Sequence, residues 1–492
     1  MESKKKQYIA VTVGPIFATM SLVSTPAALW VSSYLFSCIT KTICGLLLRY
    51  GVKEEEIISP YFSATDTALL DKKDGVGLFH DRIIFAADNF NIKDFNRIKD
   101  ETLAEISDVF EIDAEYLKEY IQIAAVKYEA ENPVFGCADI LNSRELEKPF
   151  VAEDTEQPLL KLLFGGKTSS NEWIKELAKK LGVNEKWQLT DGKGIKDLKT
   201  IVNPCVGNKL KMKKHGYYAI VRSDGDNMSK IIASLNGDEA FRSFSKNCLT
   251  YCSEIADEVA NFGGVTIYAG GDDLLAILPC ENKNGETPFD FVKRANEIFK
   301  KNFDPYQKPI ALSFGITMCY YKFPLYEALE DSAYLLFGVA KNENRKNCIA
   351  VRLQKHSGQT EGLVIPNEAL DEFLSLKNVM GKTSDFAQNG EAEKEERIIL
   401  SALHKLLLFE SLLKATDSNR EAIVTLFQNI FDSGEQKTNF LHQQLPDFYY
   451  KLKTSLKIDA MTGEGIISDP VTDITYVLRI LKFFNEKAGA GE

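Results

Sequence analysis

The sequence predicts an α+β protein of several domains, and three observations indicate this fold class. The chain has 492 residues, and one hydrophobic core rarely grows beyond about 250–300 residues, so two to four domains are expected. Hydrophobic residues make up 45% and charged residues 26% of the chain, which excludes wholesale disorder. Short apolar runs alternate with amphipathic stretches up to residue 358, and the pattern is mostly helical afterwards.

Residues 1–150 are predicted to form a first α/β unit. Strands are expected over 8–13, 56–62 and 82–87, and helices over about 20–48, 95–110 and 114–131. No charged residue occurs from Gln7 to Thr40, which is long enough to cross a bilayer. Gly14-Pro15, Pro26 and nine Ser or Thr interrupt this run. We therefore interpret it as a buried strand followed by a buried helix, and we expect no membrane association.

Residues 151–215 are predicted to be a connector or insertion. The stretch is Lys-rich, with one helix expected over 171–181. It ends in a basic cluster, Lys209, Lys211, Lys213 and Lys214.

The nine cysteines are scattered, and no pair has the C-x-x-C spacing of a zinc or redox site. Cys248 and Cys252, one helical turn apart, are interpreted as small buried apolar residues. Zinc is therefore not expected, and a reducing cytoplasm fits best.

Residues 216–358 give the clearest pattern. Strands are expected over 217–222, 265–269, 274–278, 310–320 and 348–353, and helices over 238–261, 289–303 and 325–340. The order βαββαβ, followed by one further helix and strand, predicts a ferredoxin-like sheet with its helices on one face. Residues 359–492 are predicted to be an all-α domain, with helices over 398–413 and 471–484.

Two acidic turns carry the chemistry. Asp224-Gly225-Asp226 ends the first strand of this sheet, and Gly270-Gly271-Asp272-Asp273 forms a hairpin tip. Each alone is compatible with a solvated β-turn. In the predicted topology the two turns meet at one sheet edge, and the gathered carboxylates would need cations, for which Mg²⁺ or Mn²⁺ suits oxygen ligands. Gly270 and Gly271 would turn the backbone tightly and leave room for a base or ribose.

Basic residues are expected near the same edge. Lys341, Arg345 and Lys346 follow the helix over 325–340, where they would hold a triphosphate, although a basic helix end is common for other reasons. Asn227 and Met228 would offer backbone N–H groups to a phosphate. Together these parts predict nucleotidyl transfer from a nucleoside triphosphate, assisted by two metal ions. None of the five histidines lies in these motifs.

The net charge is −11. This acidic balance argues against a free-standing protein that coats nucleic acid. Nucleic acid held by partner subunits remains compatible with it, and the cluster Lys209–Lys214 is a candidate for local contact with RNA.

Four segments resemble a known family: SDGDNMSK, VTIYAGGDDLLAILP, LSFGITMCYYKFPLYEALEDSAYLLFGVAK and RKNCIAVRLQKHSG. They are similar to the second palm domain of the large subunit of type III CRISPR effector complexes, most of all in the Cmr (III-B) branch. YIAVTVGPIFATM…ALWVSSYLFS and GLFHDRIIFA resemble that subunit's first palm domain. The resemblance implies two ferredoxin-like palm domains, a connector and a helical C-terminal domain.

The resemblance also implies an ATP-using oligoadenylate cyclase that is active when the complex binds target RNA. Its partners would be other Cmr-type subunits, the guide crRNA and the target RNA. Asp224 and Asp272 would be the metal ligands, with Asp226 as a weaker candidate, and Asp273 would assist the metal or the 3′-hydroxyl. Lys341 and Lys346 would hold phosphates, and Ser313 would face the base.

The sequence departs from the family in several ways. The first palm begins at residue 8 and His80-Asp81 is a lone HD dipeptide, so no HD nuclease is expected. The zinc-binding cysteines between the palms are missing, and the first palm lacks GGDD, which implies a structural half. Its long helix has lost the usual Arg and Lys. Members without HD are candidates for joining AMP to S-adenosylmethionine instead of cyclising ATP.

Two rival hypotheses remain. A GGDEF-type or class III nucleotide cyclase shares the palm chemistry but leaves the first palm and the helical tail unexplained. A catalytically inert scaffold subunit would be expected to lose its carboxylates first, whereas DGD and GGDD are intact here.

Overall fold

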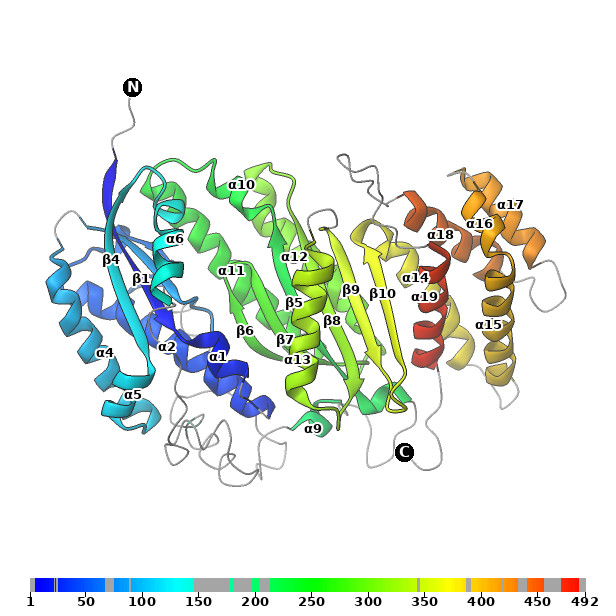
Figure 1. Cartoon of the computed structure of the whole chain (residues 1–492), viewed down its shortest axis with the longest axis horizontal. Helices are drawn as coiled ribbons and strands as arrows, with labels where there is room; N and C mark the ends of the chain where they lie inside the picture. Colours follow the sequence, from blue (N-terminus) through cyan, green and yellow to red (C-terminus); the bar gives the residue numbers. More distant parts are fainter. Residues whose placement is uncertain are drawn as a thin grey trace.

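The computed structural model describes residues 5–21, 23, 25–66, 75–87, 90–145, 177, 179, 197–202, 213–342, 346–385, 391–416, 419–431, 440–454 and 470–485. Two β-sheets lie beside each other, and a group of helices follows at the C-terminal end (Figure 1). The predicted α+β class is confirmed. Most of the predicted connector, including the helix over 171–181, Lys209 and Lys211, lies outside the described residues.

The first sheet has four antiparallel strands in the order β2-β3-β1-β4. Their bounds are β1 Lys6–Gly14, β2 Ile57–Ser59, β3 Arg82–Ala86 and β4 Gln122–Ala130. With helices between β1 and β2 and between β3 and β4, this is the ferredoxin-like arrangement that the resemblance implied.

The helix expected over 114–131 is wrong in its second half. Helix α5 (Ala114–Tyr120) ends after seven residues, and β4 follows as an edge strand. The stretch is rich in Ala and Glu, which favour helix. Its backbone instead pairs with β1 along nine residues, from Lys6 opposite Ala130 to Gly14 opposite Gln122. Tertiary pairing therefore overrides the local preference.

The long charge-poor segment forms helix α2 (Pro26–Arg49). Thr25 caps its first turn by accepting a hydrogen bond from the Ala28 N–H at 3.3 Å, and Pro26 occupies the first helical position. Among the described residues α2 is the one helix long and apolar enough for a membrane span, but 67% of that window is buried inside the protein. It packs against α4 (Phe95–Phe110), β1 and β6 (Val265–Gly270). Its apolarity is therefore that of a core helix.

The second sheet has six strands in the order β10-β9-β8-β5-β7-β6. The remaining bounds are β5 Tyr217–Asp226, β7 Asp273–Pro279, β8 Ala311–Tyr320, β9 Cys348–Gln354 and β10 Thr360–Pro366. The four strands β8-β5-β7-β6 have the predicted ferredoxin-like order. Strand β10 was not predicted; it pairs antiparallel with β9, so the sheet extends into the region expected to be helical.

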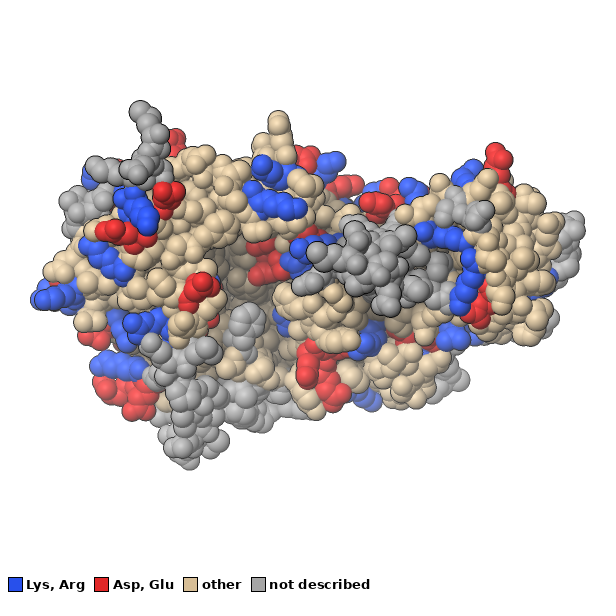
Figure 2. Space-filling view, turned by 45° about the horizontal axis from the view of Figure 1, so that its top comes forward, with Lys and Arg blue, Asp and Glu red and all other residues tan. Residues whose placement is uncertain are grey.

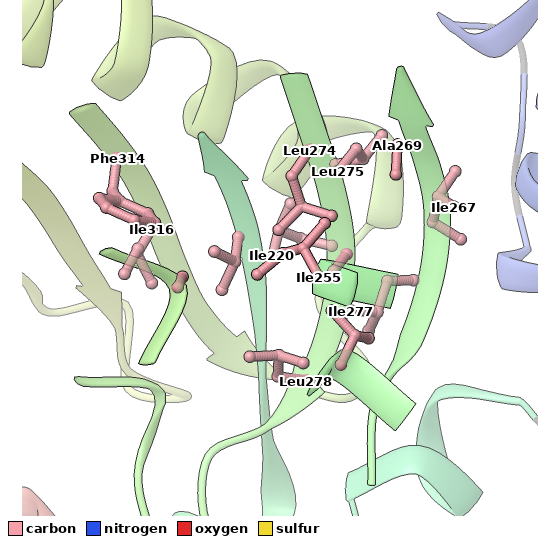
Figure 3. Packing of buried hydrophobic residues seen from close by; sticks show 14 of the residues in the cluster. Ile220, Ile255, Ile267, Ala269, Leu274, Leu275, Ile277, Leu278, Phe314 and Ile316 are labelled. Carbon is pink, nitrogen blue, oxygen red and sulfur yellow. The ribbon is translucent and has the colours of Figure 1, made fainter. Parts of the chain in front are cut away.

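Helices cover both faces of the second sheet, whereas the sequence predicted one face. Helices α11 (Asp238–Phe262) and α12 (Pro288–Phe303) pack on one face. Helix α13 (Leu325–Ala333) and the π-helical segment Tyr334–Ala340 run across the other (Figure 1). The apolar core includes aliphatic side chains of the sheet and of α11, such as Ile220, Ile277 and Ile255 (Figure 3).

Helix α11 also joins the second sheet to the first domain. The Arg242 guanidinium donates hydrogen bonds to the backbone oxygens of Ile57 at 2.5 Å and Phe62 at 2.6 Å, and it lies 4.6 Å from the centre of the Tyr61 ring. Ser245 accepts a hydrogen bond from the Tyr61 N–H at 2.7 Å. These buried polar contacts fix the loop after β2 against the second domain.

Helices form most of the described C-terminal region. They are α14 Leu370–Asp385, α15 Glu391–Leu408, α16 Glu410–Ala415, α17 Arg420–Ile430, α18 Leu445–Thr454 and α19 Pro470–Asn485. The helix expected over 398–413 is interrupted at Phe409, and the one over 471–484 is α19. Arg479 of α19 donates to the fully buried Glu361 of β10 at 3.1 Å, which ties this helix to the second sheet.

Candidate active site

The first acidic turn is a continuation of strand β5. Asp224 lies opposite Ser313 of β8, and Asp226 lies opposite Ala311. Because side chains alternate along a strand, Arg222, Asp224 and Asp226 share one face of the sheet. This is the face covered by α13, since the Arg222 Nε donates to Ser332 Oγ of that helix at 3.0 Å.

The second acidic turn closes the β6–β7 hairpin, where Gly270 pairs with Asp273. Gly271 has φ +69°, a conformation that glycine adopts without strain, so the tight turn depends on it. A Cβ added at Gly225 would lie 2.6 Å from Asp272 Oδ2. Gly225 therefore leaves the space that the Asp272 carboxylate fills, and the two turns meet as predicted.

Two of the gathered carboxylates, Asp272 and Asp273, resist ionisation. Burial and the charges of Asp273 and Asp224 raise the pKa of Asp272 well above its ordinary value, and Asp272 also hydrogen-bonds Asp224. Burial and the charge of Asp224 raise the pKa of Asp273 to about 7. Such mutual repulsion is relieved when a cation enters the group.

Lys341 supplies the positive charge in this structure. Its ammonium group pairs with Asp224 and donates to the Gly225 carbonyl at 3.0 Å. It lies 3.9 Å from Asp226 Oδ1. The side chain reaches this place from the end of the π-helical segment, so the predicted approach of Lys341 to the acidic turns holds.

Asp226 is buried and held firmly. Its Oδ2 accepts hydrogen bonds from Ser313 Oγ and from the Asn347 N–H, both at 2.7 Å. Burial raises its pKa, and its other oxygen, Oδ1, is buried without a hydrogen-bond partner. Ser313 is itself fully buried beneath this carboxylate. Its position does not support the expectation that Ser313 faces a base.

Three left-handed backbone positions surround the DGD turn. Asn227, Lys346 and Asn347 have φ of 62°, 44° and 53°. Non-glycine residues hold such conformations only where the surroundings enforce them, often at functional sites. The Lys346 N–H donates to the Ala340 carbonyl at 2.9 Å, which closes the loop toward the site. Arg345 lies outside the described residues.

A short helix, α10 (Met228–Ile232), follows the DGD turn. A helix of one turn has a small dipole, so any phosphate contact there would depend on the individual N–H groups of Asn227 and Met228. Gly270 leaves space for the Tyr268 side chain, whose oxygen would lie 2.3 Å from an added Cβ.

Two charged residues at this site, Arg222 and Asp81, were not among the predicted site residues. Burial lowers the pKa of Arg222 to about 10, and the Asp273 charge acts against that change. The alternation along β5 was a signal that would have found Arg222, two residues before Asp224. Asp81 of the first domain contributes negative charge that raises the pKa of Asp273 and Tyr268. No local pattern points to Asp81, because only the packing of the two domains brings it here.

His80, the residue before Asp81, makes contacts that stabilise the first domain. Its ring nitrogens contact Ser59 Oγ at 3.1 Å and the Arg82 N–H at 3.3 Å. Burial lowers its pKa to about 4, so it is neutral at physiological pH. Cys248 and Cys252 are buried, as predicted, and the Cys252 thiol donates to the Gly271 carbonyl at 3.4 Å.

The donor set fits a divalent cation, although within the described residues no three His, Cys, Asp or Glu are already arranged as a metal site. Asp224 and Asp272 share a hydrogen bond, Lys341 stands where positive charge is needed, and Asp226 Oδ1 has no hydrogen-bond partner. These are hard oxygen donors of the kind Mg²⁺ and Mn²⁺ prefer. The surface has a recess near the middle of the molecule with acidic and basic side chains at its edge (Figure 2).

Comparison with known proteins agrees with the resemblance seen in the sequence. Residues 217–350 match the family model of the second palm domain of Cas10/Cmr2. The chain is 28% identical over 343 residues to the Cmr2 subunit of the CRISPR Cmr system of Pyrococcus furiosus. That match covers 63% of this chain and 37% of the Pyrococcus protein, so the chain spans well under half of its relative.

Solved structures show the same fold over nearly the whole chain. A chain of the type III-B Cmr-beta complex in its apo state gives a TM-score of 0.63 at 12% identity, covering 99% of this chain and 82% of that one. A chain of the Csm1–Csm4 cassette in complex with cA4 gives 0.58 at 14% identity, covering 99% and 70%. Residues 217–350 are therefore similar to the second palm domain of Cas10/Cmr2, and the predicted resemblance to type III CRISPR large subunits is confirmed.

Proposed function

We propose that this protein is the large subunit of a type III-B CRISPR effector complex and that its second palm domain transfers a nucleotidyl group from ATP to make a second messenger. One observation carries the proposal: the DGD and GGDD carboxylates meet Lys341 at one edge of a Cas10/Cmr2 palm. The similar Csm1–Csm4 cassette has been solved with ATP, with cA3 and with cA4. The similar Cmr-beta complex has been solved with cognate target RNA.

When bound, two Mg²⁺ or Mn²⁺ ions would supply charge stabilisation for the attacking 3′-oxygen, the α-phosphate and the leaving pyrophosphate. Asp224 and Asp272 would hold them, with Asp226 Oδ1 as a further donor. Lys341 would then leave Asp224 and pair with a phosphate, joined by Lys346. The N–H groups of Asn227 and Met228 would face phosphate oxygens, and the open space beside Gly271 would admit a base or ribose.

We propose that Asp273 takes part in proton transfer. Its pKa of about 7 lies close to the pH of the cytoplasm, where a carboxylate both accepts and releases a proton readily. We assign it to the 3′-hydroxyl or to the metal site. The half-buried residues Arg222 and Asp81 carry opposite charges, and they lower and raise the pKa of Asp273 respectively.

The product we propose is a cyclic oligoadenylate. The alternative product joins AMP to S-adenosylmethionine, and the part of α2 up to Thr40, which carries no charged residue, supports this alternative. Other Cmr-type subunits would hold the guide crRNA and the target RNA, and the complex would work in the cytoplasm. A GGDEF-like cyclase would form its product without target RNA, and an inert scaffold would form no product.

The test uses the assembled complex. It is incubated with labelled ATP and Mg²⁺ or Mn²⁺, with and without target RNA and with and without S-adenosylmethionine, and the products are identified by mass. We expect cyclic oligoadenylates only when target RNA is present. A product that forms only with S-adenosylmethionine would support the alternative product instead of a cyclic oligoadenylate. If no nucleotide product formed under any condition, the result would favour an inert scaffold.

A further inference from the structure

The outer face of α13 and the π-helical segment is unusually rich in exposed aromatic residues. Tyr326, Tyr334 and Phe337 are 54%, 57% and 55% exposed, and only one other large aromatic side chain among the described residues, Phe135, is comparably exposed. An aromatic side chain has about 150–250 Å² of surface, so the three expose on the order of 300 Å² together. Patches of this size on soluble proteins commonly mark interaction sites.

The inner face of the same helix explains why this outer face is fixed. Leu325, Leu329 and Leu336 are buried against the sheet. A Cβ at Gly315 of β8 would lie 2.4 Å from the Ser332 carbonyl, so the helix backbone rests directly on the strand. The aromatic side chains are therefore presented on a rigid support, which lowers the entropic cost of binding a partner.

A recess of about 430 Å³ lies beside Tyr334, between α13 and the outward side chains of β8, β9 and β10. Glu327, Glu330 and Asp331 line it. Asp331 pairs with Arg352 and accepts from Thr317 Oγ1 at 2.7 Å. Glu327 and Glu330 are exposed, and within the described residues neither forms an ion pair. The recess therefore keeps two carboxylates that no described cation neutralises.

The contacts of Arg352 show that a guanidinium group fits this recess. Its guanidinium lies 5.7 Å from the centre of the Tyr334 ring while it pairs with Asp331. A carboxylate beside an aromatic face is the environment that a guanidinium or ammonium group prefers. Glu327 and Glu330 offer the same pairing on the exposed side of the same ring.

We propose that Tyr326, Glu327, Glu330, Tyr334 and Phe337 form a docking surface for a protein segment that presents Arg or Lys side chains next to apolar ones. Charge complementarity selects this partner, because the carboxylates attract cations and repel the phosphates of RNA. The aromatic side chains would bury the apolar part of the segment, as hot-spot residues do in protein interfaces. The inference does not depend on nucleotidyl transfer, since none of these residues belongs to the catalytic constellation.

The test is a fluorescence-anisotropy titration of the full chain with a labelled peptide of alternating Arg and Leu, and with a short labelled single-stranded RNA. Two double variants, Tyr334→Ala with Phe337→Ala and Glu327→Lys with Glu330→Lys, are compared with a matched control, Glu119→Lys with Asp139→Lys, on exposed positions of the first domain. Thermal unfolding verifies that each variant is folded.

We expect the peptide to bind about tenfold more weakly to both test variants and within about twofold of wild type to the control. Equal weakening in the control, or no peptide binding by wild type, would overturn the proposal. RNA binding that is lost with Tyr334 and Phe337 while peptide binding persists would assign the surface to nucleic acid and overturn it as well.

Discussion

At the scale of single residues, the site is a set of carboxylates that the fold holds together against their own repulsion. Asp272 and Asp273 have raised pKa values because burial and neighbouring carboxylates disfavour their charged forms. Lys341 offsets part of this cost through Asp224. The motif spacing was enough to predict Asp224, Asp272 and Lys341 at one place. It did not predict the internal partner of Asp226, because Ser313 is far away in sequence.

The raised pKa values predict pH-dependent metal binding. In the metal-free protein Asp273, with a pKa of about 7, is protonated below that pH, and burial and the charges of Asp273 and Asp224 also raise the pKa of Asp272. A cation must displace these protons, so Mn²⁺ affinity should rise about tenfold per pH unit for each proton released below pH 7. Calorimetric titrations at pH 6 and pH 8 measure this, and an affinity equal at both would contradict the account.

Lys341 is predicted to be more important for catalysis than for folding. Replacing it with Met removes the cation that would hold a phosphate, and we expect ATP turnover to fall about 100-fold, as when a charge-stabilising donor is lost. Lys341→Arg keeps the charge and should retain part of the activity. Steady-state kinetics of both variants are the measurement. If ATP turnover by Lys341→Met were within threefold of wild type, Lys341 would not be part of the catalytic site.

Among the helices and strands, those with strong local sequence signals were predicted correctly. The prediction failed where pairing with a segment far away in the sequence determines the structure. The βαββαβ order over 216–358 followed from clear apolar periodicity and a GGDD hairpin. Strand β4 was taken for helix because its Ala and Glu favour helix, while its pairing with β1, over a hundred residues earlier, is invisible locally. Strand β10 was not predicted for a related reason, because its antiparallel pairing with β9 determines that it is a strand. The π-helical segment, which brings Lys341 to Asp224, also had no sequence signal.

Gly315 is predicted to control the seating of α13 on the sheet. In Gly315→Ala the new Cβ would meet backbone atoms, the Ser332 carbonyl at 2.4 Å and the Leu336 N at 2.5 Å. The helix must then shift, and we expect a loss of about 1–3 kcal/mol of unfolding free energy. Gly362→Ala on β10 is the matched control, because its nearest neighbour would be 3.9 Å away. Urea unfolding compares the two, and equal stabilities would contradict the packing argument.

At the scale of the whole molecule, the two ferredoxin-like domains are joined by α11 and by the apolar α2. Helix α2 packs against its own sheet and against β6, which explains a run that resembles a membrane span in the sequence. The same packing brings Asp81 near Asp273. The net charge of −11 includes these gathered carboxylates. The resemblance supplied the two-domain architecture, whereas residue patterns alone indicated only an α/β unit before residue 150.

Arg242 is predicted to be the main polar link between the domains. Arg242→Ala leaves the carbonyls of Ile57 and Phe62 without their donor, and we expect a loss of about 2–3 kcal/mol of unfolding free energy. Arg49→Ala removes an exposed pair with Glu105 and should change this free energy by less than about 1 kcal/mol. Thermal and urea unfolding test the difference, and an equal loss in both variants would contradict the role of Arg242.

The proposed synthesis of a nucleotide product depends on the two acidic turns of the second sheet. The most direct measurement compares wild type with Asp272→Ala and Asp273→Ala combined, each in the assembled complex with target RNA, ATP and Mg²⁺ or Mn²⁺. We expect the double variant to assemble normally and to form no product from ATP, because two carboxylates proposed to act with the cations are gone. Unchanged product formation in the double variant would contradict the catalytic assignment.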